Sequence, residues 1–186
     1  MENNKFKLSE KDKKDLLHIA RITIEQYINE NNIPDIDISN FSEILLSNCG
    51  AFVTLTQRGV LRGCIGRFNP SSPLHKIVQQ MTIASSTQDY RFNKISPNEI
   101  DNLRIEISVL SPMKKINSID EINLGRDGIY IKKENSSGTF LPQVANETNW
   151  TKKEFLGHCA RDKAGIGWDG WKDADIYIYE AIVFHE

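Results

Sequence analysis

The sequence "AFVTLTQRGVLRGCIGRF", residues 51–68, carries the clearest signal of secondary structure in the chain. Residues 51–56 are rich in β-branched and aromatic side chains, which favour an extended strand, and residues 57–59 supply a turn. Residues 60–68 then resume extended character, so the stretch predicts a β-hairpin. Its second strand is unusual, because glycine weakens a strand and arginine is costly to bury, and this strand holds two of each around a cysteine.

The side chains of that second strand should alternate between two faces. One face is predicted to carry Arg62, Cys64 and Gly66, and the other Leu61, Gly63 and Ile65. Arg62 then neighbours the Cys64 thiol, where a guanidinium favours the thiolate form. Glycines flanking the cysteine open its backbone to a ligand. A structural interpretation competes, because cysteine is often buried and strand glycines often mark a bulge or a close packing contact.

Helical spacing of apolar residues predicts helices over residues 9–31, 74–88 and 151–165. Ser9 with Asp12 fits a capping box for the first, and Pro73 suits the first turn of the second. Thr151 caps the third helix and Gly165 closes it. A short helix start is also expected at Ser96.

Strict alternation in "RIEISVL", residues 104–110, predicts a strand with Ile105, Ile107 and Val109 facing the core. Two more strands are expected within residues 127–145 around a Ser/Gly turn, and a long strand over residues 175–184. Helices and strands mix without βαβ regularity. We therefore predict an α+β fold with a mainly antiparallel sheet flanked by helices.

Composition limits the class of protein. The chain has 186 residues, a formal net charge of −2, and 39% hydrophobic and 26% charged residues, which predicts one globular domain, residues 1–186, with a polar tail over residues 1–8. A net charge of −2 lacks the excess of basic residues that binds phosphate groups, so it disfavours nucleic-acid binding. No signal peptide or membrane-spanning run is visible, so we expect a cytoplasmic protein whose three cysteines stay reduced.

Six motifs of the chain together resemble those of the AMMECR domain family, of the AmmeMemoRadiSam system protein A type. They cover nearly the whole chain in the expected order. The motifs are "LRGCIG" (61–66), "DYRF" (89–92), "LRIEISVLSP" (103–112), "GRDGIYI" (125–131), "LPQVANETNW" (141–150) and "EFLGHCARDKAG" (154–165).

The resemblance implies a compact α+β domain of two lobes, with the cysteine-bearing strand lining an interlobe cleft. It also implies Memo-like and radical SAM proteins as partners, and no established reaction. The segment "RDKAGIGWDGW", residues 161–171, departs from the shorter form that is commoner in the family. Its Arg161 and Asp162 place charged side chains near the last turn of the predicted helix, so the sequence does not predict how this turn packs.

Cys64 is the leading candidate nucleophile, and a cysteine nucleophile normally needs a nearby base. His158 is the best candidate, because it lies in a family motif, whereas His18 and His75 look like solvated helix positions and His185 adjoins the C-terminus. The structural alternative for His158 is an imidazole that satisfies a helix-end or core hydrogen bond.

Further side chains are candidates for substrate binding. Asp89 and Arg91 suit an anion-reading corner, since an arginine offers a planar fork to carboxylate or phosphate, although such a pair is more often a structural salt bridge. The remaining candidates are Arg62, Gly63, Gly66, Arg67, Gln143 and Glu147. Cysteine and histidine spacing does not predict a metal site, and no cofactor is expected.

Two hypotheses follow. In the first, the protein is an enzyme in which a Cys64 thiolate acts on a small anionic molecule or a protein segment, with His158 as base and Arg62 or Arg91 stabilising charge. In the second, the same region is a non-catalytic binding module or scaffold. A third hypothesis, nucleic-acid binding, is disfavoured by the charge.

Overall fold

The computed structural model describes residues 6–68 and 71–186, and the chain divides by its internal contacts into two compact units. Unit 1 comprises residues 1–110 and 182–186, and unit 2 comprises residues 111–181. Residues 1–5 of the predicted tail and residues 69–70 of the loop after the hairpin lie outside the described residues. Of the remaining tail residues, Leu8 is buried and Phe6 packs against the core of unit 1.

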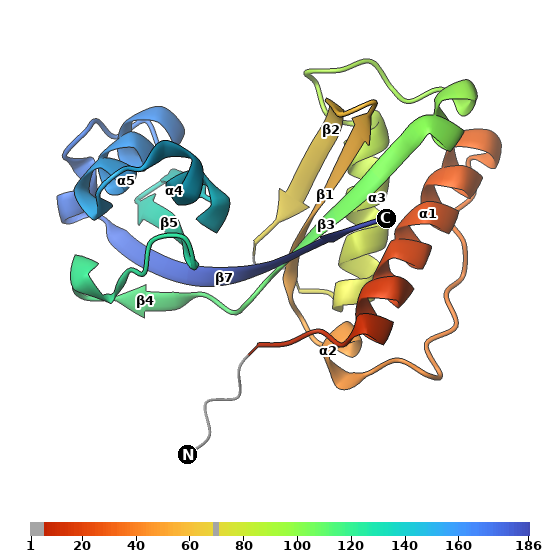
Figure 1. Cartoon of the computed structure of the whole chain (residues 1–186), viewed down its shortest axis with the longest axis horizontal. Coiled ribbons are helices and arrows are strands. Elements are labelled where there is room, and N and C mark those ends of the chain that lie inside the picture. Colours follow the sequence, from red (N-terminus) through yellow and green to blue (C-terminus); the bar gives the residue numbers. More distant parts are fainter. Residues whose placement is uncertain (1–5, 69–70) are drawn as a thin grey trace. The chain divides into compact units, whose positions relative to one another are not determined.

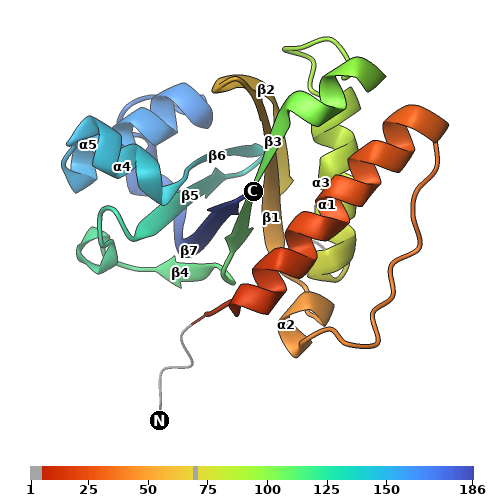
Figure 2. The same ribbon diagram turned by 45° about the vertical axis from the view of Figure 1, so that its right-hand side comes forward.

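Unit 1 is a three-stranded antiparallel sheet in the order β2-β1-β3, joined by the end of β7. Figure 1 shows α1 and α3 against these strands, and Figure 2 shows the two helices side by side. The elements are α1 (Glu10–Glu30), α2 (Glu43–Leu46), β1 (Gly50–Gln57), β2 (Val60–Arg67), α3 (Leu74–Thr87), the 3₁₀ helix η1 (Pro97–Asn102) and β3 (Leu103–Leu110).

Unit 2 is a smaller antiparallel sheet in the order β4-β7-β5-β6. Its α-helices follow β6 in the chain, and β7 continues from unit 2 into unit 1. The elements are β4 (Lys114–Ile116), η2 (Ile119–Glu121), β5 (Asp127–Lys133), β6 (Ser136–Phe140), α4 (Pro142–Thr148), α5 (Lys152–His158), the π-helical η3 (Cys159–Lys163), η4 (Gly170–Asp173) and β7 (Asp175–His185).

Local sequence signals account for most of these elements. Ser9 and Asp12 make both bonds of the capping box that begins α1, and Thr151 and Glu154 do the same for α5. Ile105 of β3 is fully buried, as strand alternation predicts, and so are Ile107 and Val109. Each unit has its own hydrophobic core. The predicted α+β class with a mainly antiparallel sheet is confirmed.

Three local predictions need correction. The turn between β5 and β6 lies at residues 134–135, and Gly138 lies within β6, where the backbone of Ala164 leaves no room for a side chain. Pro73 caps α3 and is not part of its first turn. His75 is not solvated: its ring is buried edge-on to Phe41, with Nδ1 2.9 Å from the Leu45 carbonyl oxygen.

Candidate functional site

The hairpin contains a β-bulge at Arg62. Thr56 pairs with Leu61, but the next residue of β1, Leu55, pairs with Gly63, so the register shifts there. The predicted alternation therefore does not extend across Arg62, and the assignment of Leu61 to the face of Gly63 is wrong. The same shift places Thr54 opposite Cys64.

Packing explains the two glycines that flank Cys64. A Cβ added at Gly63 would overlap the carbonyl oxygen of Ser85 in α3, and one added at Gly66 would overlap the Phe52 ring. The Ser85 hydroxyl also accepts a hydrogen bond from Ile65 N–H at 3.0 Å and donates one to the Val53 carbonyl at 2.7 Å, which ties α3 to both strands. These glycines let a helix and an aromatic ring lie directly on the strand.

Cys64 is half-buried, and its sulfur has a hydroxyl partner. The Thr54 hydroxyl donates a hydrogen bond to Cys64 Sγ across the strand pair, with 3.3 Å between the heavy atoms. A hydrogen bond donated to a thiolate favours the charged form. Strand pairing thus places a hydroxyl donor beside the sulfur of Cys64.

Asp89 and Arg91 hold the main chain of Cys64. Asp89 Oδ2 accepts a hydrogen bond from Cys64 N–H at 2.9 Å, and Arg91 Nη2 donates one to the Cys64 carbonyl at 3.2 Å. The two side chains are joined by Arg91 Nε to Asp89 Oδ1 at 2.9 Å and Arg91 Nη2 to Asp89 Oδ2 at 2.7 Å. β2 is an edge strand, so one side of its backbone has no partner strand. The Asp89–Arg91 pair bonds the N–H and carbonyl groups of Cys64 instead.

The same pair fixes the charges beside the cysteine. The Asp89 side chain is only 4% exposed, and the hydrogen bond from Arg91 holds the pKa of its carboxyl far below the usual range. Asp89 therefore stays a carboxylate and is a poor base. Arg91 is 45% exposed, and its pKa is raised first by the hydrogen bond to Asp89. A half-exposed cation thus bonds the main chain of Cys64.

Arg62 makes its side-chain hydrogen bonds to groups other than the Cys64 thiol. Its guanidinium donates to Glu99 at 2.8 and 3.2 Å and to the carbonyls of Asn93 at 2.6 Å and Lys94 at 3.2 Å. The bulge at Arg62 breaks the two-residue spacing that would have kept its side chain beside that of Cys64. Arg67 donates to Gln80 at 3.4 Å.

The Arg62–Glu99 pair predicts a pH-dependent contribution to stability. The hydrogen bond from Arg62 lowers the pKa of Glu99 from 4.5 to about 2, so the folded state gains stability above pH 4.5 and loses it as pH falls toward 2. We expect Glu99→Gln to destabilise the protein by about 2 kcal/mol at neutral pH. The difference from the natural protein should shrink as pH falls below 4.5, which urea unfolding at several pH values measures. An equal difference at all pH values would contradict this assignment.

His158 lies in unit 2 within an aromatic cluster. Its ring stacks on Trp150 with centroids 3.8 Å apart and meets Trp168 edge-on at 4.9 Å. Nδ1 lies 3.0 Å from Asp162 Oδ2, and Arg161 and then His158 lower the pKa of Asp162 to about 2. The unusual Arg161–Asp162 segment is therefore accommodated by a π-helical turn, in which both side chains bond around His158.

The predicted site residues fall into two groups. Unit 1 holds Arg62, Gly63, Cys64, Gly66, Arg67, Asp89 and Arg91, and unit 2 holds Gln143, Glu147 and His158. Only Asp89 and Arg91 of the first group bond to Cys64, and they do so through its backbone. Gln143 and Glu147 lie on α4. Sequence reasoning missed Thr54, which becomes the partner of the sulfur because of the bulge.

The described residues do not show two other kinds of site. Residues 6–68 and 71–186 contain no cluster of three histidine, cysteine or acidic side chains that would hold a metal ion. In the same part of the chain, each helix is too short or too polar to cross a bilayer.

These features define an α+β domain with a cysteine on an edge strand, whose backbone is fixed by an aspartate–arginine pair. The AMMECR1 family model matches residues 17–184, so the chain belongs to the AMMECR1 family. The resemblance of the sequence to the AMMECR domain family is confirmed.

Relatives support this assignment along nearly the full length. A protein of Methanosarcina mazei is 34% identical over 187 residues, which is 96% of this chain and 94% of the relative. A protein of Thermococcus kodakarensis is 36% identical, over 92% of this chain and 88% of the relative. The crystal structure of an uncharacterized protein from Pyrococcus horikoshii matches with a TM-score of 0.87 and 34% identity, covering 97% of this chain and 94% of that one.

Proposed function

We propose that the surface of unit 1 around Cys64 is the functional site of this AMMECR1-family protein, and that Cys64 acts there as a nucleophilic thiol. The observation that carries the proposal is the hydrogen bond from the Thr54 hydroxyl to Cys64 Sγ. Cys64 is the half-buried cysteine of unit 1, whereas Cys49, the other cysteine of this unit, is buried, so the Cys64 sulfur is the one that a ligand can reach.

The charges beside Cys64 favour an acidic or carbonyl-bearing ligand. Nε and Nη2 of Arg91 bond Asp89, and no hydrogen bond from its Nη1 is seen among the described residues. That nitrogen of a half-exposed guanidinium is suited to a carboxylate, phosphate or carbonyl oxygen. We therefore propose a small anionic molecule or a protein segment as the ligand. A Memo-like or radical SAM protein is the source of such a segment in this proposal.

Catalysis also needs a group that takes the Cys64 proton. Asp89 is unsuitable, because its bonds to Arg91 and to Cys64 N–H keep its pKa far too low. His158, the base that the sequence suggested, lies in unit 2 with its Nδ1 3.0 Å from Asp162 Oδ2, and the proposal does not place it at Cys64.

Replacement of Cys64 by serine tests the proposal. The hydroxyl fits beside Thr54, so we expect thermal unfolding to shift by less than about 2 °C, while the weakly acidic hydroxyl abolishes nucleophilic function. Complementation of a deletion strain should therefore fail with Cys64→Ser. The matched control is Cys49→Ser, which removes a buried thiol of the same unit and should complement wherever it folds. Full complementation by Cys64→Ser would contradict a nucleophilic role.

A further inference from the structure

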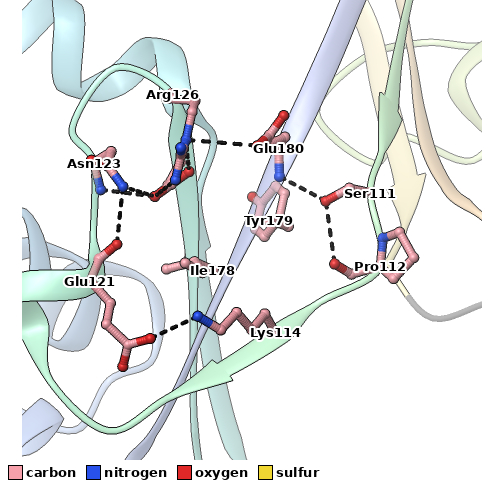
Figure 3. A pocket seen from close by; sticks show the side chains of 10 residues that line it. Ser111, Pro112, Lys114, Glu121, Asn123, Arg126, Ile178, Tyr179 and Glu180 are labelled. Atoms are coloured by element: carbon pink, nitrogen blue, oxygen red, sulfur yellow. Dashed lines mark hydrogen bonds and ion pairs between the residues drawn. The ribbon is translucent and has the colours of Figure 1, made fainter. Parts of the chain in front are cut away.

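Unit 2 contains a half-open cavity that the Cys64 site does not use. Its volume is about 360 Å³, within the range of small-ligand sites. Figure 3 shows side chains from β4, from the segment before β5 and from β7 around it. The lining residues include Ser111 and Pro112 of one family motif and Arg126 and Asp127 of another. Two family motifs that 12 residues separate in the sequence thus meet at one cavity.

The segment before β5 is held in place by a buried carboxylate. The Asp127 side chain is 2% exposed and accepts hydrogen bonds from Arg126 Nε at 2.7 Å, Arg126 Nη2 at 3.0 Å and Asn123 N–H at 2.8 Å. Gly125 has φ of +83°, and a Cβ there would overlap Asn146 Oδ1. The guanidinium of Arg126 is thereby fixed at the rim of the cavity, where it is 56% exposed.

The charges around the cavity do not balance. Lys114 pairs with Glu121 at 2.8 Å and Arg126 pairs with Asp127, which leaves Glu180 as the third carboxylate against two cations. Glu180 Oε1 lies 3.7 Å from Arg126 Nε, too far for a hydrogen bond, and the side chain is 49% exposed. The cavity therefore has an acceptor for one more cationic group.

Hydrogen-bond donors of Arg126 and Lys114, which could bind an oxygen atom of a ligand, line the same cavity as Glu180. Among the described residues, Arg126 Nη1 has no hydrogen-bond partner, and Lys114 Nζ, 66% exposed, donates only to Glu121. A ligand that fits both features has an ammonium group next to a carbonyl oxygen. Its single positive charge would neutralise the lining.

We propose that this cavity binds an α-ammonium group with its adjacent carbonyl, as found at the free amino terminus of a peptide. Glu180 accepts hydrogen bonds from the ammonium, and Arg126 and Lys114 donate to the carbonyl oxygen. Ile178, which is buried, also lines the cavity. This site goes beyond the proposed function of Cys64, and either proposal stands or fails without the other.

Titration of the full chain with tri-alanine, followed by two-dimensional ¹⁵N–¹H NMR, tests this proposal. We expect saturable shifts of the amide signals of residues 123–127 and 178–180 with the free peptide, and binding at least about tenfold weaker with N-acetyl tri-alanine or with ethylamine. Glu180→Gln should weaken binding of the free peptide by about tenfold or more. Glu134→Gln, a matched change at an exposed turn of the same unit, should leave it unchanged.

Three results would overturn the proposal. One is the absence of saturable shifts at these residues with about 10 mM free peptide. Another is equal affinity for the free peptide and either the acetylated peptide or ethylamine. The third is equal weakening by Glu180→Gln and Glu134→Gln. Glu180 makes its structural bonds through its backbone and is half-exposed, so its substitution is expected to leave the fold intact.

Discussion

Iodoacetamide should label Cys64 of the folded protein at least about 100-fold faster than Cys159 at neutral pH. Cys159 is fully buried, and burial raises the pKa of its thiol to about 12, so almost none of it is thiolate. Cys49 is buried as well and should also react slowly. Cys64 is half-buried and receives the Thr54 hydrogen bond.

Peptide mapping by mass spectrometry after timed labelling gives the three rates separately. Labelling in urea is the control, because unfolding should make the three rates similar. Equal labelling of Cys64 and Cys49 in the folded protein would contradict an activated thiol at position 64.

Gly63→Ala should lower the free energy of unfolding by about 3 kcal/mol, because the added methyl group overlaps a backbone atom that cannot rotate away. The Ser85 carbonyl oxygen occupies that space, and Ser85 is itself bonded to both strands of the hairpin. Either α3 or β2 must move, which breaks those bonds. We expect the thermal unfolding midpoint to fall by about 10 °C.

Val60→Ala is the matched control for this prediction. Val60 lies on the same strand but is 69% exposed, so removal of its methyl groups should change stability by less than about 0.5 kcal/mol. A Gly63→Ala protein with the midpoint of the control would mean that Gly63 is not required for packing against α3.

Local patterns in the sequence predicted most of the fold. The Ser9 capping box, the alternating strand around Ile107 and the Thr151 cap depend on residues within a few positions of one another, and all three are present. The family motifs supplied the overall assignment, which the family model and the relatives confirm.

The site was less predictable, because its contacts connect distant parts of the chain. Asp89 bonds the backbone of Cys64, 25 residues away, and a pair spaced as Asp89 and Arg91 gives no sign of that partner. Arg62 bonds Glu99, 37 residues away. His75 looked solvated because its bond to the Leu45 carbonyl crosses 30 residues.

The contact of Thr54 with the Cys64 sulfur is the one that the sequence pattern was least able to predict. Extending the register of the turn, where Gln57 pairs with Val60, would place Val53 opposite Cys64. The bulge at Arg62 moves the register by one residue and brings the Thr54 hydroxyl to the sulfur instead. Composition and alternation carry no signal for such a bulge beyond the presence of glycines.

The rate of Cys64 alkylation in Thr54→Val and Thr54→Ser proteins shows whether the Thr54 hydroxyl acts on the sulfur of Cys64. Valine keeps the shape of threonine but cannot donate to Sγ, so it removes the hydrogen bond on which the proposed role of Cys64 depends. We predict an alkylation rate at neutral pH that is about threefold lower for Thr54→Val and nearly unchanged for Thr54→Ser. An equal or faster rate in Thr54→Val, with the fold intact, would contradict the claim that Thr54 prepares Cys64 as a nucleophile.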